Sequence, residues 1–113
     1  MVEDEAIILI GICDELSALG FQVYEASNAR AAIDQLLLHP NIEVLFTDID
    51  MPGDMDGLLL AKLVRGRWPP IKIIITSGMH CFTKEELPVV GRFLPKPYAP
   101  SSVVSAIHEL LAA

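Results

Sequence analysis

An apolar run that stops abruptly at a carboxylate constrains the fold of this chain more than any other feature. Residues 44–49 are Val-Leu-Phe-Thr-Asp-Ile, and a loop containing proline, glycine and aspartate follows. Parallel strands are buried on both faces, so their sequences are continuous apolar runs. Ligands of open α/β sheets bind just beyond the carboxyl ends of such strands. Asp48 is therefore a candidate functional residue; the alternative is a strand-ending aspartate that simply begins a turn.

Helix-like and strand-like segments alternate along the chain, which predicts an α/β fold with βαβ units and a parallel sheet. Strands are expected at residues 21–25, 43–47, 71–76 and 92–94. Helices are expected at residues 6–19, from Ser27 or Asn28 to about His39, from 57 to about 67, and from Pro100 to about 111. Gly20 is the expected end of the first helix, and between residues 77 and 90 Pro88 leaves room only for a short helix at 83–86.

Composition excludes several classes of function. The 113 residues suit one domain, and 52% hydrophobic residues argue against disorder. A net charge of −7 argues against a nucleic-acid surface, which needs clustered basic residues. The acidic start at residues 3–5 is unlike a secretory signal, and the apolar run at 6–13 is too short to span a membrane. We therefore expect a cytoplasmic protein with no nucleic-acid or membrane partner.

Polar residues follow several of the predicted strands. Asp48, Thr76 and Lys96 each come at or just after a strand end, and Glu3 and Asp4 follow the start of the chain. Clustered carboxylates repel one another unless a hard cation lies among them, and Mg²⁺ prefers oxygen ligands. A carboxylate, a hydroxyl, an ammonium group and Mg²⁺ together suit phosphoryl transfer.

Four segments carry a resemblance to a known family. They are residues 3–5 (Glu-Asp-Glu), 48–52 with 55–57 (Asp-Ile-Asp-Met-Pro and Met-Asp-Gly), 75–78 (Ile-Thr-Ser-Gly) and 93–98 (Phe-Leu-Pro-Lys-Pro-Tyr). In this order and spacing they resemble the bacterial two-component response-regulator receiver domain over nearly the whole chain. The resemblance implies a doubly wound, flavodoxin-like sheet of five parallel strands in the order 2-1-3-4-5.

The resemblance also implies a set of reacting and metal-binding residues. Asp48 corresponds to the phosphoacceptor, which takes a phosphoryl group from a histidine kinase or phosphotransfer protein in a phosphorelay. Asp4 corresponds to a direct Mg²⁺ ligand and Glu3 to one acting through water, and Asp48 and the backbone carbonyl of Asp50 complete the metal site. Lys96 corresponds to the site lysine, whose bond to the following proline is cis in that fold.

Thr76 and Phe93 correspond to the family's switch residues, a hydroxyl and an aromatic ring that respond to phosphorylation. The alternative is that Phe93 is an ordinary core residue. Two departures stand out: the loop containing Gly53 and Asp54 is one residue longer than usual, and Pro88 interrupts the fourth helix.

Residues 1–113 are expected to form one stand-alone receiver domain without an output domain. Only Met1 and Val2 precede the acidic cluster, so the first strand is expected to be truncated. If these residues were the whole polypeptide, the chain should be marginally stable or dimeric through strand exchange, so a homodimer is one expected state.

Two other functions remain open at this point. Asp48 and Asp50 resemble the D-x-D pair of a phosphatase of the haloacid-dehalogenase type, although that family needs an acidic pair after the lysine and here only Glu109 follows. A receiver-like binding module that is never phosphorylated is the third possibility. The leading interpretation is a switch rather than an enzyme with a separate substrate.

Overall fold

The computed structural model describes residues 16–49, 57–78 and 91–112. Within them, helices and strands alternate from α2 to β2, and β3 and α4 follow after the gap at residues 79–90. In chain order they are α2 (Ala29–Leu38), β1 (Val44–Asp48), α3 (Gly57–Arg67), β2 (Lys72–Ser77), β3 (Arg92–Pro95) and α4 (Pro100–Ala112).

The described part of the sheet has three parallel strands in the order β1-β2-β3. This matches the last three positions of the expected order 2-1-3-4-5. The register sets Asp48 opposite Thr76 and Thr76 opposite Leu94, so the ends of the three strands lie in one row. Residues 1 and 2, where the truncated first strand is expected, lie outside the described residues.

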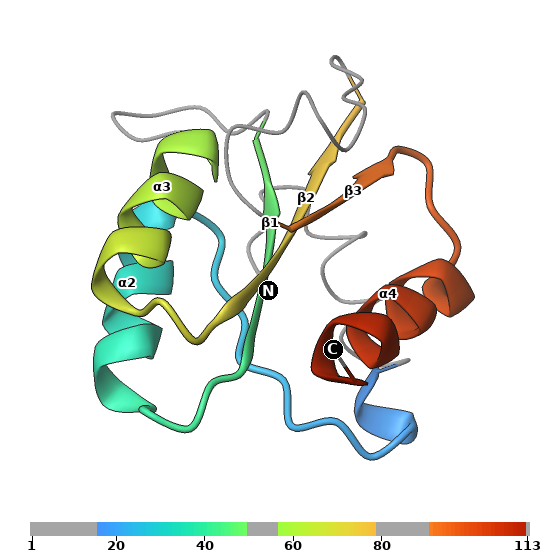
Figure 1. Ribbon diagram of the computed structural model, residues 1–113, viewed down its shortest axis with the longest axis horizontal. Coiled ribbons are helices and arrows are strands. Elements are labelled where there is room, and N and C mark those ends of the chain that lie inside the picture. The colour runs from blue at the N-terminus through green and yellow to red at the C-terminus, as the bar shows by residue number, and fades with distance from the viewer. Residues whose placement is uncertain (1–15, 50–56, 79–90, 113) are drawn as a thin grey trace.

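Helices cover both faces of this sheet (Figure 1), with α2 and α3 on one face and α4 on the other. Side chains alternate between the faces along each strand. Leu45, Ile73 and Ile75 join a buried cluster with residues of α2 and α3, whereas Phe46 and Ile74 join a second cluster with residues of α4. Burial on both faces explains why the strand sequences are continuous apolar runs.

Several helix ends lie where the sequence predicts them. Asn28, one of the two candidate caps, accepts a hydrogen bond from the Ala31 N–H at 2.8 Å and begins α2. Residues 16–18 are helical, and Gly20 follows with φ +93°, a conformation that glycine adopts without strain. Pro100 is the first residue of α4, where its missing N–H costs no hydrogen bond.

The strand predicted at residues 21–25 is wrong for the described residues: the segment carries no strand assignment, and only Ala26 forms an isolated bridge. Its side chains are nonetheless held, because Phe21 and Val23 pack against the cluster beneath α4 and Tyr24 stacks on His39 with ring centroids 3.9 Å apart. In the expected order this strand pairs only with the first strand. The alternating apolar pattern of residues 21–25 correctly predicts which side chains are packed. It does not show whether a neighbouring strand is present to form the backbone hydrogen bonds.

The predicted helix at residues 83–86, Pro88 and residues 6–15 of the first predicted helix lie outside the described residues. In the part of the chain that the structure describes, no helix is long and apolar enough to span a lipid bilayer.

Candidate functional site

Asp48 is the last residue of β1, and its side chain is almost completely buried, at 1% exposure. By strand alternation it lies on the same sheet face as Phe46, the face that α4 covers. The Ile49 N–H donates to the carbonyl of Thr76 at 3.1 Å, which keeps the end of β1 against β2. A carboxylate buried to this degree needs a charged or hydrogen-bonding partner.

Lys96 provides that partner. Its Nζ donates to Oδ2 of Asp48 at 2.6 Å, and its side chain is 14% exposed. The Lys96 N–H donates to the carbonyl of Ser77 at 3.0 Å, which fixes the backbone just after β3. The bond from Lys96 to Pro97 is cis, as the resemblance implies. Burial strengthens this charge-assisted bond, because little water competes with it.

The stem of Lys96 runs beside Gly78, just past the end of β2. A Cβ placed on Gly78 would lie 3.6 Å from Cβ and 3.7 Å from Cδ of the lysine. These are ordinary van der Waals distances, so the lysine stem lies beside Gly78 without crowding it. The ends of β2 and β3 thus confine the lysine that reaches Asp48.

Thr76 lies directly opposite Asp48 in the register and is fully buried. Its hydroxyl has no hydrogen-bond partner among the described residues. A buried hydroxyl left without a partner costs about 1–3 kcal/mol, so such groups mark places where a ligand or functional partner would bind. By strand alternation this hydroxyl lies on the same sheet face as the Asp48 carboxylate.

Phe93 lies one row away from Thr76. It is opposite Ile75, is half-buried, and packs against the cluster on the α2 and α3 face. By alternation the Thr76 side chain lies on the other face, with Ile74. The structure therefore places the two expected switch residues at successive rows on opposite faces, and the switching function of Phe93 stays a prediction.

Three of the expected metal ligands, Glu3, Asp4 and Asp50, lie outside the described residues. Among the residues that the structure does describe, no group of three or more His, Cys, Asp or Glu side chains could hold a metal. Asp48 is the described member of the expected set. Its buried carboxylate, with acidic residues expected beside it, is the oxygen donor chemistry that Mg²⁺ requires.

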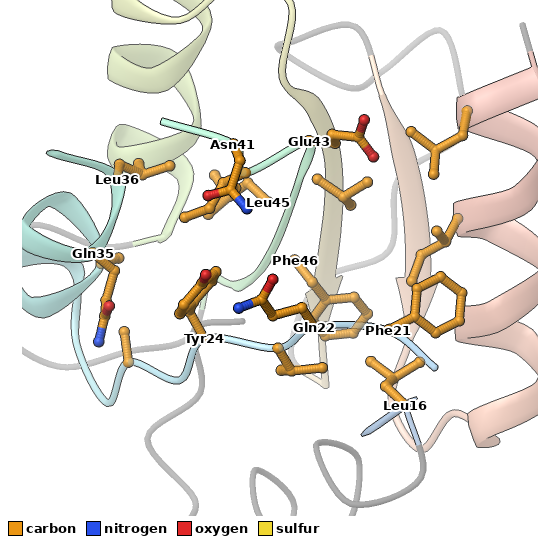
Figure 2. Close-up of a pocket in the computed structure, with 17 residues that line it drawn as sticks. Leu16, Phe21, Gln22, Tyr24, Gln35, Leu36, Asn41, Glu43, Leu45 and Phe46 are labelled. Atoms are coloured by element: carbon orange, nitrogen blue, oxygen red, sulfur yellow. The ribbon is translucent and has the colours of Figure 1, made fainter. Parts of the chain in front are cut away.

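A cavity of about 450 Å³ lies away from this site, along β1 towards its amino end. Figure 2 shows side chains that line it, among them Phe21, Gln22 and Tyr24 from the segment before α2 and Leu45 and Phe46 from β1. Asp48, Thr76 and Lys96 do not line it. The three candidate site residues therefore lie at the row of strand ends, outside the cavity.

Sequence reasoning missed one contact close to the site. The rings of Phe46 and Tyr98 meet edge to face, with centroids 5.3 Å apart and planes at 70°. Phe46 is two residues before Asp48, and Tyr98 is two residues after Lys96. The sequence signal was that each aromatic residue lies two positions from a candidate site residue. This spacing does not predict a contact unless the ends of the strands are already known to be neighbours.

Comparisons with known proteins agree with this arrangement. A sequence profile of the response regulator receiver domain matches residues 1–108. The chemotaxis protein CheY of Thermotoga maritima is 31% identical over 97% of this chain and 93% of its own length. The sensor kinase CckA of Brucella abortus is 31% identical over 98% of this chain, which spans only 12% of the kinase.

Solved structures agree as well. The response regulator receiver protein from Sinorhizobium medicae superposes with a TM-score of 0.88 at 29% identity, covering 99% of this chain and 91% of that one. A probable response regulator/GGDEF domain protein gives a TM-score of 0.85 at 28% identity, with 98% of this chain covered and 47% of that one. The flavodoxin-like fold that the sequence predicts is confirmed. This chain belongs to the response regulator receiver domain family.

Proposed function

We propose that this chain is a phosphorylation-dependent signalling switch that accepts a phosphoryl group on Asp48. The donor is the phosphohistidine of a cytoplasmic histidine kinase or phosphotransfer protein. The observation that carries the proposal is the buried Asp48–Lys96 ion pair, at 2.6 Å, beside the buried hydroxyl of Thr76. Relatives include both a long kinase and a protein of nearly this length, so the proposal concerns the domain.

In the transfer, a carboxylate oxygen of Asp48 attacks the phosphorus in line with the phosphorus–nitrogen bond. A new oxygen–phosphorus bond forms, and the electron pair of the broken bond returns to the imidazole of the donor. Negative charge spreads over the three equatorial oxygens of the phosphoryl group. Lys96, held at the carboxylate before the reaction, stabilises that charge without reorganisation, and the Thr76 hydroxyl donates a hydrogen bond to one oxygen.

Mg²⁺ is part of the proposed site. Asp48, Asp4 and the backbone carbonyl of Asp50 would bind it, and Glu3 would contribute through water. When bound, the ion offsets charge on the phosphoryl oxygens. Lys96 alone leaves the acidic groups of the expected cluster only partly neutralised, which is why a divalent cation suits them.

The switch itself is proposed to begin at Thr76. Once its hydroxyl is drawn to a phosphoryl oxygen, the end of β2 shifts relative to β3, where Phe93 lies opposite Ile75. The half-buried Phe93 ring would then change its packing and alter a surface that a protein partner contacts. The chain has no separate substrate in this scheme, so it acts as a switch and not as an enzyme.

Incubation with acetyl phosphate and Mg²⁺, followed by intact-mass measurement, tests the proposal. We expect the mass of one phosphoryl group to be added, and the adduct to be absent in Asp48→Asn. Asp34→Asn, which changes an exposed aspartate of α2, is the matched control and should be phosphorylated normally. A folded protein that gains no adduct would indicate the passive binding module instead.

The same sample separates the phosphatase alternative. The family match favours the receiver domain over a haloacid-dehalogenase-type enzyme. Repeated turnover of a phosphomonoester that is lost in Asp50→Asn would support the phosphatase, whereas a receiver would give a single labile adduct and no such turnover.

A further inference from the structure

The short connection between β3 and α4 carries Lys96 to Asp48. β3 ends at Pro95 and α4 begins at Pro100. At its start, the Lys96 N–H donates to the Ser77 carbonyl. At its far end the Ala99 carbonyl accepts from Ser102 and Val103, which begins α4.

A lysine side chain is a poor means of fixing its own ammonium group. Its four-carbon stem is flexible, and holding it in one geometry costs conformational entropy. The position of Nζ therefore depends on how firmly the backbone around Lys96 is held relative to β1. A displacement of about 1 Å at a reacting group can lower a rate about a hundred-fold.

Within the described residues, an ion pair and an aromatic contact both link this connection to β1. Lys96 meets Asp48 at 2.6 Å, and Tyr98 meets Phe46 at a ring-centroid distance of 5.3 Å. Phe46 and Asp48 are alternate residues of one strand and lie on the same face. The connection therefore touches β1 at two positions in succession, one through an ion pair and the other through aromatic rings.

The aromatic contact is part of a packed core cluster. Phe46 is 4% exposed and belongs to the cluster with Ile74 and the buried residues of α4, and Tyr98 packs against that cluster. The phenolic oxygen of Tyr98 is buried as well. Because the cluster fixes the Tyr98 ring, it also fixes the backbone two residues earlier, from which the lysine extends.

We propose that Tyr98 is a positioning residue for Lys96. Its ring packs edge to face on Phe46 and so fixes the distance between the connection and β1. That distance determines where the Lys96 ammonium group lies relative to Asp48. This inference rests on the proposed phosphoryl transfer for its kinetic consequence. Its structural consequence does not depend on that function.

The first measurement is the rate of phosphorylation by acetyl phosphate at saturating Mg²⁺. Tyr98→Leu, which removes the ring, should slow the reaction about ten- to a hundred-fold. Tyr98→Phe, which keeps the ring and loses the hydroxyl, should restore a rate near that of the unchanged protein. Phe21→Leu is the matched control, since Phe21 packs against the same cluster but its ring contacts His108.

The second measurement is the ¹⁵N signal of the Lys96 side-chain ammonium, assigned by its loss in Lys96→Arg. An ammonium held against a buried carboxylate exchanges slowly with water, so its signal should be visible in the unchanged protein, Tyr98→Phe and Phe21→Leu. It should broaden or vanish in Tyr98→Leu. Should Tyr98→Leu fail to fold, Tyr98→Met replaces it, because methionine keeps most of the apolar volume.

Each outcome decides the inference. A Tyr98→Leu protein that keeps the ammonium signal and slows no more than Phe21→Leu would overturn it, and so would a Tyr98→Phe protein as slow as the leucine variant. If the unchanged protein takes up no phosphoryl group, the proposed function fails, but loss of the ammonium signal in Tyr98→Leu alone would still support the positioning function of Tyr98.

Discussion

The buried polar side chains at the ends of β1 and β2 differ in whether they have a bonding partner. Asp48 is buried but paired with Lys96, so its charge is compensated. Thr47 is fully buried and donates to the carbonyl of Asp48 at 3.2 Å. Thr76 is equally buried, and its hydroxyl has no partner within the described part of the chain. Among these buried groups, the Thr76 hydroxyl is therefore expected to destabilise the fold, and substitutions can distinguish it from the others.

Replacing the threonine of β2 by valine should stabilise the unphosphorylated protein. Thr76→Val removes a buried hydroxyl without a partner and keeps the shape, so the free energy of unfolding should rise by about 1 kcal/mol. Thr47→Val is the matched control, with the opposite sign expected, because it removes a hydroxyl that does make a hydrogen bond. Urea unfolding of both variants measures this difference, and equal shifts in the two would contradict it.

Removing the charge of Lys96 should destabilise the fold because it leaves the Asp48 carboxylate buried. Breaking a buried pair from one side costs about 3–5 kcal/mol, and the partial exposure of Lys96 places Lys96→Met near the lower value. Adding Asp48→Asn should recover much of that loss. Lys62→Met, at an exposed position of α3, should stay within about 0.5 kcal/mol of the unchanged protein. Strictly additive effects of the two site substitutions in urea unfolding would show that the pair is not coupled.

The regular elements of the fold were predictable from local sequence. Apolar runs located β1 and β2 to within a residue, Asn28 and Pro100 marked helix starts, and the resemblance supplied the cis bond after Lys96. Residues 21–25 were not predictable in the same way, because a strand requires a neighbour and the alternating pattern does not report whether one is present. The Phe46–Tyr98 contact was missed because it joins segments far apart in the chain.

Close approach between β2 and the start of β3 makes one glycine irreplaceable. A Cβ on Gly91 would lie 2.4 Å from the carbonyl oxygen of Ile73, a backbone atom that cannot move aside cheaply. Gly91→Ala should therefore lower the free energy of unfolding by about 2 kcal/mol or more, as overpacking does. Gly66→Ala, in α3 with nothing within 4 Å of the added carbon, should instead stabilise by about 0.5 kcal/mol. Thermal unfolding compares the two, and similar melting temperatures would refute the crowding at Gly91.

On the scale of the whole molecule, the candidate site and the cavity lie towards opposite ends of β1. Its carboxyl end carries the paired Asp48, while the cavity of about 450 Å³ extends along the strand in the other direction. Both core clusters reach the cavity, through Leu45 on one face of the sheet and Phe46 on the other. Phe46 lines the cavity and also contacts Tyr98, two residues after Lys96. A change in packing at the cavity can therefore reach the candidate site through Phe46.

The most direct test of the account is the chemical identity of residue 48 after phosphorylation. The protein is treated with acetyl phosphate and Mg²⁺ and then with borohydride, which reduces an aspartyl phosphate to homoserine, and peptide mass spectrometry locates the change. If Asp48 is the phosphoacceptor, homoserine appears at position 48 and every other aspartate stays unmodified. Homoserine at another position, or none in a folded sample, would contradict it.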